Sequence, residues 1–210
     1  MVIASILEQF LQGILDTGMV EFIAVIAGIA SVWFSRKAHI LVYPIGLINT
    51  LLYIYLSFKG SLYGEASVNI YYSVMSIYGW IQWSKKDLQT NDLKLQIQFS
   101  NRKEWIEQLL FFSCCYAFIF SALTWLKQSF APAAIPWADG FASASAFTGM
   151  WLMTRKKVES WIWWTATNIA SIPLYFMKGY VFTSVQFMVL LVLSIAGLIS
   201  WRKKVMYELC

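Results

Sequence analysis

The sequence predicts an all-α membrane protein with seven transmembrane helices in a 3+1+3 arrangement, and three observations lead to this fold class. First, 59% of the 210 residues are hydrophobic and 13% are charged, whereas soluble domains are about 45–50% apolar and about 25% charged. Second, apolar runs of about 20 residues, the length that spans a bilayer, alternate with short basic segments. Third, several motifs recur once in each half of the chain.

The chain begins with polar residues set among apolar ones, namely Glu8, Gln9, Gln12 and Asp16. This pattern predicts a short helix in the membrane interface over residues 1–19. Seven spans are predicted after it, at about residues 21–34, 40–58, 62–83, 105–126, 138–154, 159–177 and 180–201. The first three spans form one unit (20–86) and the last three form another (138–204). Between them lie a cytoplasmic loop, a linker helix and an outer loop (87–137), and a cytoplasmic tail (205–210) ends the chain.

The positions of Lys and Arg test this count of spans, because cytoplasmic loops carry most of the basic residues of a membrane protein. With the N-terminus outside, thirteen of the sixteen basic residues fall in the predicted inner loops. These thirteen are Arg36, Lys37, Lys85, Lys86, Lys94, Arg102, Lys103, Arg155, Lys156, Lys157, Arg202, Lys203 and Lys204. The alternation predicts an outer N-terminus and a C-terminus in the cytoplasm.

Short motifs recur in order in the two halves. S-R-K, N and K-G at residues 35–37, 49 and 59–60 return as T-R-K, N and K-G 119 residues later. The acids Glu21 and Asp139, and the two G-x-x-x-W motifs at 79–83 and 197–201, recur at an interval of 118. Three spans plus one give both copies the same orientation, as in transporters built from parallel repeats. Asn49 and Asn168 are then expected to be equivalent residues that face the axis between the copies.

The sixth predicted span carries the strongest candidate site. Trp161, Trp164 and Asn168 follow the spacing i, i+3, i+7, which places them on one face of a helix. Two indoles and an amide suit a flat ring with polar edges, and an indole face also attracts a cationic ring. We therefore predict that this face lines a substrate site. In the alternative interpretation, the tryptophans belong to the membrane belt and Asn168 only bonds a neighbouring helix.

Other side chains within the spans complete the candidate substrate site: Asn49, Asn69, Tyr72 and Gln186. Polar residues are costly in a membrane unless they find partners, so they mark interior surfaces. Helix–helix hydrogen bonds explain them equally well. Trp163 points away from the candidate face and is expected in the aromatic belt or in contact with lipid, and Trp83 and Trp201 are expected in the aromatic belt near span ends.

Several classes of function lack their motifs. No acidic residue lies deep in a predicted span, and the one histidine, His39, falls in an inner loop, so a proton relay is not predicted. The phosphate-binding motif of ATPases is missing, as are a nucleophile–base constellation and a metal-ligand cluster. No enzyme, cofactor or metal site is therefore predicted. The net charge of +5 is a topology signal rather than a sign of nucleic-acid binding.

The motif W-x-x-W-x-x-x-N at 161–168, the Y-G-W at 78–80 and the run L-M-T-R-K-K-V-E-S-W at 152–161 resemble the PnuC family of bacterial vitamin transporters. The resemblance covers residues 20–204 and is strongest over 139–201. It implies a bundle of seven spans with parallel repeats, like a full-length SWEET-type protein. It also implies that Trp161, Trp164 and Asn168 line the substrate site.

The same resemblance implies that nicotinamide riboside, a precursor of NAD, enters by facilitated diffusion across the bacterial inner membrane and is trapped by a cytoplasmic kinase. One position departs from the family, because members that carry nicotinamide riboside often have a glutamine where this chain has Asn69. Thiamine and riboflavin therefore remain alternative substrates, and the sequence leaves a homo-oligomer open. A membrane binding or scaffold protein without transport is the alternative from another class, and an intramembrane enzyme is the third.

Overall fold

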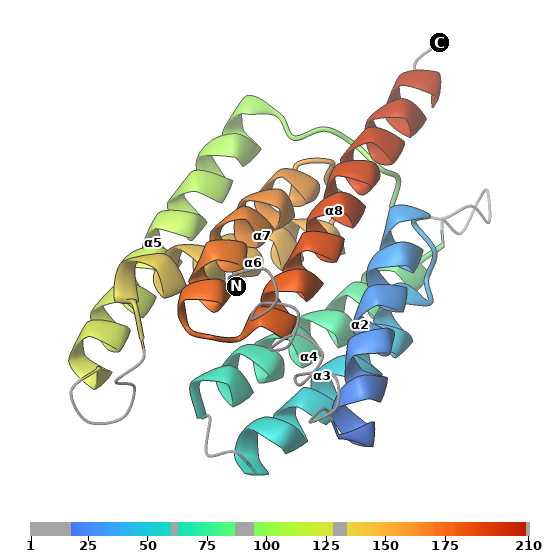
Figure 1. Ribbon diagram of the computed structural model, residues 1–210. Helices are drawn as coiled ribbons and strands as arrows, with labels where there is room; N and C mark the ends of the chain where they lie inside the picture. The colour runs from blue at the N-terminus through green and yellow to red at the C-terminus, as the bar shows by residue number, and fades with distance from the viewer. Residues whose placement is uncertain (1–17, 60–62, 87–94, 128–133, 209–210) are drawn as a thin grey trace, which may run out of the picture.

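The structure, a computed structural model, describes residues 18–59, 63–86, 95–127 and 134–208, and most of these residues belong to seven helices (Figure 1). The helices are α2 (Met19–Arg36), α3 (Val42–Lys59), α4 (Tyr63–Ser84), α5 (Arg102–Leu126), α6 (Pro136–Thr154), α7 (Ser160–Met177) and α8 (Val181–Glu208). The all-helical prediction is confirmed, and each predicted span coincides with one helix. The predicted interfacial segment lies almost entirely outside the described residues.

Three of these helices combine the length and the hydropathy of a membrane span. They are Met19–Arg36 with a mean hydropathy of 1.6, Arg102–Leu126 with 1.9 and Val181–Tyr207 with 2.2. The other helices include polar and small residues within their lengths, such as Asn49 in α3 and Asn168 in α7. Because such side chains need partners in a bilayer, these helices are suited to the interior of the bundle.

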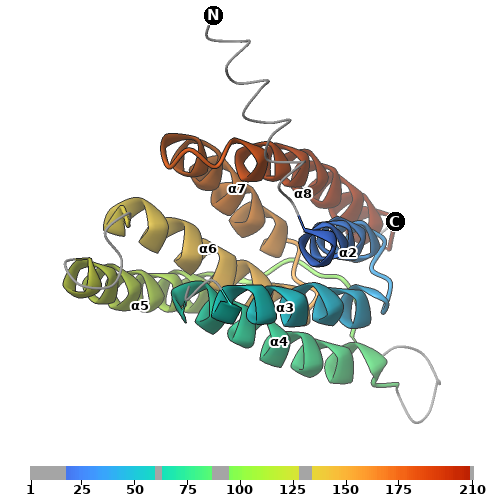
Figure 2. The same cartoon turned by 60° about the horizontal axis from the view of Figure 1, so that its bottom comes forward.

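Six helices form a closed ring, and α5 packs against its outside. α3 contacts α2 and α4, and α7 contacts α6 and α8. The ring closes where α4 contacts α6 and where α2 contacts α8. α5 contacts α6 and lies at the edge of the bundle, as Figures 1 and 2 show from two directions. The centre of the ring is therefore the place where side chains from α2–α4 and α6–α8 can meet.

α5 buries a tryptophan that the sequence pattern assigned to lipid. The indole nitrogen of Trp163 donates to Gln108 over 3.1 Å, and the ring of Phe112 lies 4.8 Å from that of Trp163. Trp163 is 9% exposed and Gln108 is fully buried. The expectation of a lipid-facing Trp163 is therefore wrong, because the linker helix supplies both a ring and an acceptor for it.

Contacts within α2–α4 recur within α6–α8 at a fixed interval of 118 residues. Asn49 donates to the carbonyl oxygen of Ala24 over 2.7 Å, and the hydroxyl of Thr167, which donates to Trp163 of its own helix over 3.0 Å, also lies 3.4 Å from the carbonyl oxygen of Ala142. Both pairs join the first helix of a group to the second. A polar side chain thus ties the same two helices together in each half.

The turns that follow α2 and α6 keep the same interval. Ala38 and Lys156 both have positive φ, at 56° and 52°. The amide of Ala38 donates to the carbonyl oxygen of Ser35 over 2.8 Å, and that of Lys156 donates to Met153 over 3.0 Å. A positive φ is unusual outside glycine, so these turns mark the register of the two halves clearly.

This register corrects the expected equivalence of Asn49 and Asn168. At an interval of 118 residues, Asn49 corresponds to Thr167, and Asn168 corresponds to Thr50. The basic motifs and the two asparagines recur at 119 in the sequence, but the turn geometry and the helix–helix hydrogen bonds follow 118. The two asparagines therefore do not occupy corresponding positions in the two halves.

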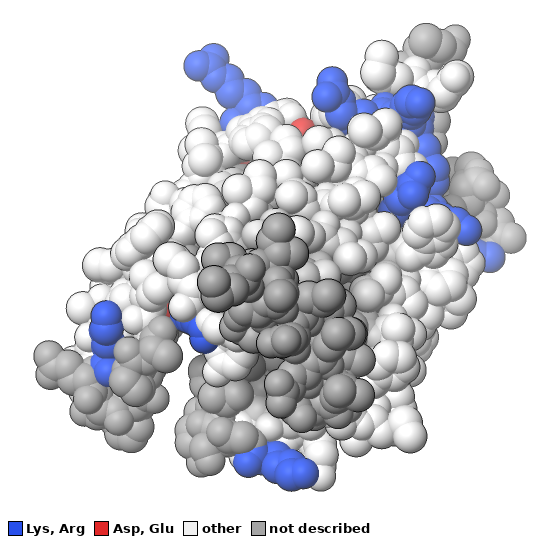
Figure 3. Space-filling view, in the orientation of Figure 1, with Lys and Arg blue, Asp and Glu red and all other residues white. Residues whose placement is uncertain are grey.

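Charged side chains gather at the two ends of the bundle. In Figure 3 a broad face carries neither sign of charge, and most Lys and Arg lie at the end where α8 finishes. At this end, which we call the basic end, Lys204 donates to the carbonyl oxygen of Lys37 over 3.0 Å. At the opposite end, Lys178 pairs with Asp139 over 2.7 Å, and Asp139 also accepts the amide of Ile135 over 2.7 Å.

Candidate functional site

Trp164 lies in a group of four aromatic rings where α4 meets α6 and α7. The ring centroids of Tyr72 and Trp164 are 6.2 Å apart, and Phe147 lies 6.2 Å from Tyr72 and 4.4 Å from Tyr71. The hydroxyl of Tyr71 donates to the carbonyl oxygen of Phe147 over 3.1 Å. We call these four residues the central aromatic cluster. It joins the two halves of the ring and offers π faces to a flat ligand.

Asn168 lies one helical turn beyond Trp164 and is 3% exposed. Its amide nitrogen donates to the hydroxyl of Ser194 over 3.4 Å, which is a long hydrogen bond. Ser194 also exchanges a hydrogen bond with Thr165 over 3.0 Å and donates to the carbonyl oxygen of Leu191 over 2.9 Å. An asparagine side chain offers two donor hydrogens and an acceptor oxygen, so this loosely held amide retains capacity for a ligand.

The position that corresponds to Trp164 in the other half holds a glycine instead of an aromatic residue. Trp164 corresponds to Gly46, and the residue that it faces, Gly149, corresponds to Ser31. A Cβ on Gly149 would lie 3.3 Å from the indole of Trp164, and a Cβ on Gly46 would lie 3.0 Å from the hydroxyl of Ser31. The glycine therefore lies on the first helix of one half and on the second helix of the other, and only one half has a tryptophan opposite it.

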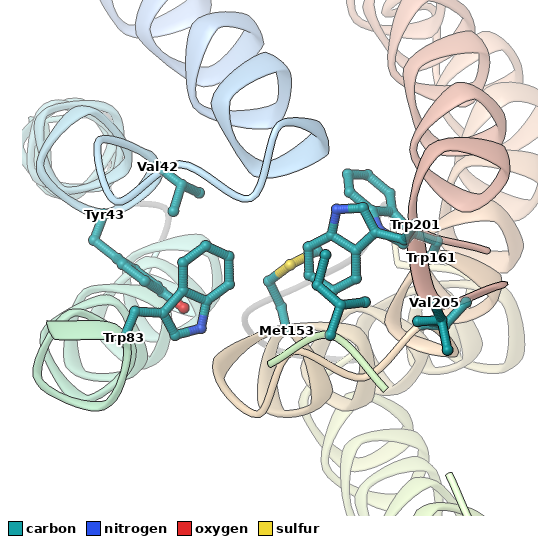
Figure 4. Packing of buried hydrophobic residues seen from close by; sticks show 9 residues of the cluster. Val42, Tyr43, Trp83, Met153, Trp161, Trp201 and Val205 are labelled. Carbon is teal, nitrogen blue, oxygen red and sulfur yellow. The ribbon is translucent and has the colours of Figure 1, made fainter. Parts of the chain in front are cut away.

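Trp161 belongs to a different group, although it shares a helix face with Trp164. It is 1% exposed and meets Trp201 edge-on, with ring centroids 5.6 Å apart. Tyr43 meets Trp83 in the same way at 5.1 Å. Figure 4 shows the two pairs on opposite sides, with Met153 between them. Trp164 packs only against the edge of this buried cluster, so the structure separates the two predicted tryptophans.

The two pairs also touch each other across the ring at the basic end. Trp83 of α4 and Trp201 of α8 have ring centroids 6.2 Å apart. The hydroxyl of Ser35 in α2 donates to the sulfur of Met153 in α6 over 3.0 Å. Each contact joins a residue to its own counterpart, 118 positions away. Such self-contacts are expected where a two-fold axis passes between the halves.

The remaining predicted residues are distributed around the ring. Asn49 is engaged with the carbonyl oxygen of Ala24 and presses on Gly28, where an added Cβ would lie 2.8 Å from its amide. Asn69 and Gln186 are half-buried in α4 and α8. Gln186 precedes Ser194 by two helical turns, about 12 Å. The structure brings Trp164 and Tyr72 together, with Asn168 one turn further along α7, and places Trp161 in the buried cluster at the basic end.

Two residues of the buried cluster at the basic end were not identified as buried from the sequence. Trp83 and Trp201 were expected in the aromatic belt, but they are 2% and 0% exposed. The indole nitrogen of Trp201 donates to the carbonyl oxygens of Ser35 and Arg36, both over 3.1 Å. The repeated G-x-x-x-W motif could have indicated this burial. In each copy one aromatic ring, Tyr43 or Trp161, packs against both the glycine and the tryptophan of the motif.

A short extended segment, residues 95–100, crosses the basic end, and we call it the strap. Its Gln98 exchanges backbone hydrogen bonds with Lys156 and Val158 over 3.2 and 3.1 Å. The amide of Ser100 donates to both carboxylate oxygens of Glu159 over 3.0 Å, and its hydroxyl donates to that carboxylate over 2.7 Å. These bonds hold the strap to the turn between α6 and α7.

Lys156 reinforces this turn from within. Its ammonium donates to the carbonyl oxygen of Leu95 over 2.8 Å and lies 4.7 Å from the ring centre of Trp83. Burial lowers the pKa of Lys156, and the nearby charge of Lys204 lowers it further. Within the described residues, no group of three or more His, Cys, Asp or Glu side chains could hold a metal ion.

Comparisons with known proteins agree on one family. The profile of the nicotinamide mononucleotide transporter family matches residues 18–203. The nicotinamide riboside transporter PnuC of Escherichia coli is 25% identical over 206 residues, covering 89% of this chain and 86% of its own. The PnuC transporter of Neisseria mucosa is 28% identical over 197 residues, covering 87% of this chain and 72% of its own.

Two further matches extend the comparison to another vitamin and to the fold. The riboflavin/roseoflavin transporter RibM of Streptomyces davaonensis is 22% identical over 184 residues, covering 86% of this chain and 83% of its own. The crystal structure of the vitamin B3 transporter PnuC matches with a TM-score of 0.69 and 22% identity, covering 94% of this chain and 87% of that one. The fold is therefore that of PnuC.

Proposed function

Since the chain belongs to the nicotinamide mononucleotide transporter family, a family of membrane transporters and not of enzymes, we propose that it imports nicotinamide riboside by facilitated diffusion. The protein is a multi-pass membrane protein, and its family and relatives carry small vitamin-like molecules. Two of the similar transporters carry nicotinamide riboside by name. A cytoplasmic kinase then traps the substrate by phosphorylation, which keeps the inward gradient steep.

The observation that carries the proposal is the pairing of the central aromatic cluster with a loosely bonded, buried amide. Nicotinamide riboside has a flat cationic ring and hydrogen-bonding edges. The faces of Trp164 and Tyr72 attract such a ring by stacking and by cation–π interaction. Asn168 supplies donors and an acceptor one turn away. Asn69, Gln186 and Trp161 stay in the proposed site as residues that reach the substrate in other states of the transport cycle, whereas Asn49, which donates to Ala24, takes the alternative role of a helix–helix hydrogen bond.

The proposed architecture is two three-helix units, α2–α4 and α6–α8, joined by α5 as parallel repeats in a 3+1+3, SWEET-like plan. Recurrent contacts at an interval of 118 residues support it. The units rock about the axis between them, so that the central site opens to each side in turn. The basic end faces the cytoplasm of a bacterium, with the N-terminus outside, as the loop charges support.

Riboflavin is the second candidate substrate, because the transporter RibM is also similar over most of the chain. Thiamine remains a third, since its cationic ring suits the same indole face. Purified protein in liposomes should take up labelled nicotinamide riboside without an ion gradient, and an ionophore should not slow the uptake. If only riboflavin or only thiamine is taken up in a saturable way, that vitamin replaces nicotinamide riboside as the proposed substrate. No flux of any of the three would favour a binding or scaffold protein.

The site itself is tested by two substitutions and one control. Trp164→Ala and Asn168→Ala should each lower uptake by at least about tenfold while the protein still folds. Trp125→Ala is the matched control, because Trp125 is 80% exposed on α5. Tryptophan-fluorescence quenching by nicotinamide riboside should be saturable in the control and lost in Trp164→Ala. Normal transport by both variants would show that Trp164 and Asn168 do not form the substrate site.

A further inference from the structure

The centre of the ring is closed at the basic end by contacts between helices that are not ring neighbours. Trp83 of α4 reaches Trp201 of α8, and Ser35 of α2 reaches Met153 of α6. Contacts across the centre differ in kind from contacts between neighbouring helices, because the centre is the route that a substrate must take. A path along the centre of the ring from the central aromatic cluster to the basic end would meet these two contacts.

The strap adds a further layer below them. Ile97 of the strap is 8% exposed and belongs to the same buried cluster as Trp83, Trp161 and Trp201. The backbone bonds of Gln98 and the three bonds to Glu159 fasten the strap to the second unit. Ile97 therefore travels with α6–α8, while the cluster that it belongs to also contains Val42, Tyr43 and Trp83 of the first unit.

These observations identify a device. We propose that the contacts Trp83–Trp201 and Ser35–Met153, covered by Ile97 of the strap, form the cytoplasmic gate of the transport path. The gate deepens the proposed transport function and rests on it. In this arrangement Trp161, which packs against Gly197 and Trp201, lies between the gate and Trp164 of the proposed site, one turn away.

Unpaired polar hydrogens in the closed gate favour its opening. The hydroxyl of Tyr43 and the indole nitrogens of Trp83 and Trp161 are buried and make no hydrogen bond within the described residues. A buried donor without a partner destabilises the state that contains it. When the units separate at the basic end, water reaches these groups and the penalty ends. This penalty lowers the free-energy cost of opening the proposed gate.

The gate is tested first by a reporter that needs no substrate. Asn168→Cys places a thiol at a buried position above the gate, in protein whose three native cysteines are replaced by serine. Its labelling by a membrane-impermeant methanethiosulfonate is followed from the basic side in inside-out vesicles. Ile97→Ala should speed labelling about tenfold, because a smaller side chain stabilises the closed state less. Phe99→Ala is the matched control on the same strap, since Phe99 is 42% exposed.

A reversible lock makes the second test. Ile97→Cys and Trp83→Cys, joined by a short bis-methanethiosulfonate reagent, should abolish labelling of Asn168→Cys from the basic side. Without the reporter, the same cross-link should abolish uptake of nicotinamide riboside, and reductant should restore it. A matched cross-link between Glu104→Cys of α5 and Lys157→Cys of the second unit should leave both measurements unchanged, since these residues form an ion pair that does not involve the first unit.

The outcomes separate this proposal from the proposed function. Labelling that ignores both Ile97→Ala and the cross-link overturns the gate, even if nicotinamide riboside is taken up normally. Unlocked protein that transports none of the vitamin overturns the proposed substrate, while the labelling still decides the gate. Equal acceleration by Phe99→Ala would show that any change in the strap loosens the protein, which also overturns the specific role of Ile97.

Discussion

Tyr43 and Trp161 occupy corresponding places in the two halves of the ring, 118 residues apart. Each is 1% exposed, and each meets a tryptophan edge-on, at interplanar angles of 84° and 86°. Each also presses on the glycine of a G-x-x-x-W motif, Gly79 or Gly197. The same packing solution is thus used twice at the basic end.

Enlarging these glycines should destabilise the protein. A Cβ on Gly197 would lie 2.6 Å from the ring of Trp161, so Gly197→Ala should lower the free energy of unfolding by about 1–3 kcal/mol. Gly79→Ala should do the same against Tyr43. Thermal unfolding in detergent measures the loss. Gly18→Ala is the control, because nothing lies within 4 Å of its added Cβ; equal melting temperatures for all three variants would refute the tight packing.

The two asparagines should respond differently to the same truncation. Asn49→Ala removes one helix–helix hydrogen bond and should lower stability by about 0.6 kcal/mol, with uptake per folded protein unchanged. Asn168→Ala should reduce uptake at least about tenfold, which is about 1.4 kcal/mol of substrate interaction, with a smaller change in melting temperature. Uptake and unfolding are measured on the same preparations. Loss of uptake in Asn49→Ala would mean that Asn49 reaches the substrate.

The two residues of the ion pair at the end opposite the basic end should contribute unequally to the free energy of unfolding. Asp139 pairs with Lys178 and also accepts the amide of Ile135 at the start of α6. Lys178→Met removes only the partly exposed pair, worth about 0.2–1 kcal/mol. Asp139→Ala removes the helix-end interaction too and should cost about 1 kcal/mol more. A double-mutant cycle isolates the pair, and equal losses from both single variants would contradict the second role of Asp139.

The carboxylate of Glu159 should control how firmly the strap is attached. It accepts three hydrogen bonds from Ser100 while 4% exposed. Glu159→Gln removes the charge from these bonds and should cost about 1.5–3 kcal/mol. Trypsin should then cleave at Arg102 and Lys103, beside the strap, faster than in the unaltered protein. Glu107→Gln, the same change at a partly exposed site on α5, is the control and should be cleaved at the unaltered rate.

Hydropathy and charge were sufficient to predict the helices, because span length and loop charge are local properties of the sequence. α8 nevertheless continues to Glu208 rather than ending near residue 201, since nothing in the basic run Arg202–Lys204 breaks a helix. The periodicity of α7 correctly placed Trp161, Trp164 and Asn168 on one face. The periodicity could not show that Trp161 packs against Trp201, because Trp201 lies 40 residues further along the chain.

The register between the halves was the harder inference. Matching residue types aligned Asn49 with Asn168, whereas the turns at Ala38 and Lys156 set the interval one residue shorter. Residue identity reports what a position needs chemically, and a positive φ at a lysine leaves no mark in the sequence. The burial of Trp163 was missed for a related reason, because Gln108 sits on the separate helix α5.

The exchange between Gly46 and Trp164 has a consequence for how a molecule lies in the centre of the ring. A chamber between two identical halves would present an indole on both walls, and a flat ring could enter in either of two equally good poses. Here one wall carries Trp164 and the matching place on the other carries a glycine opposite Ser31. In the proposed site this difference removes the degeneracy, so a substrate with one aromatic end and one hydroxyl-rich end would have a single preferred orientation.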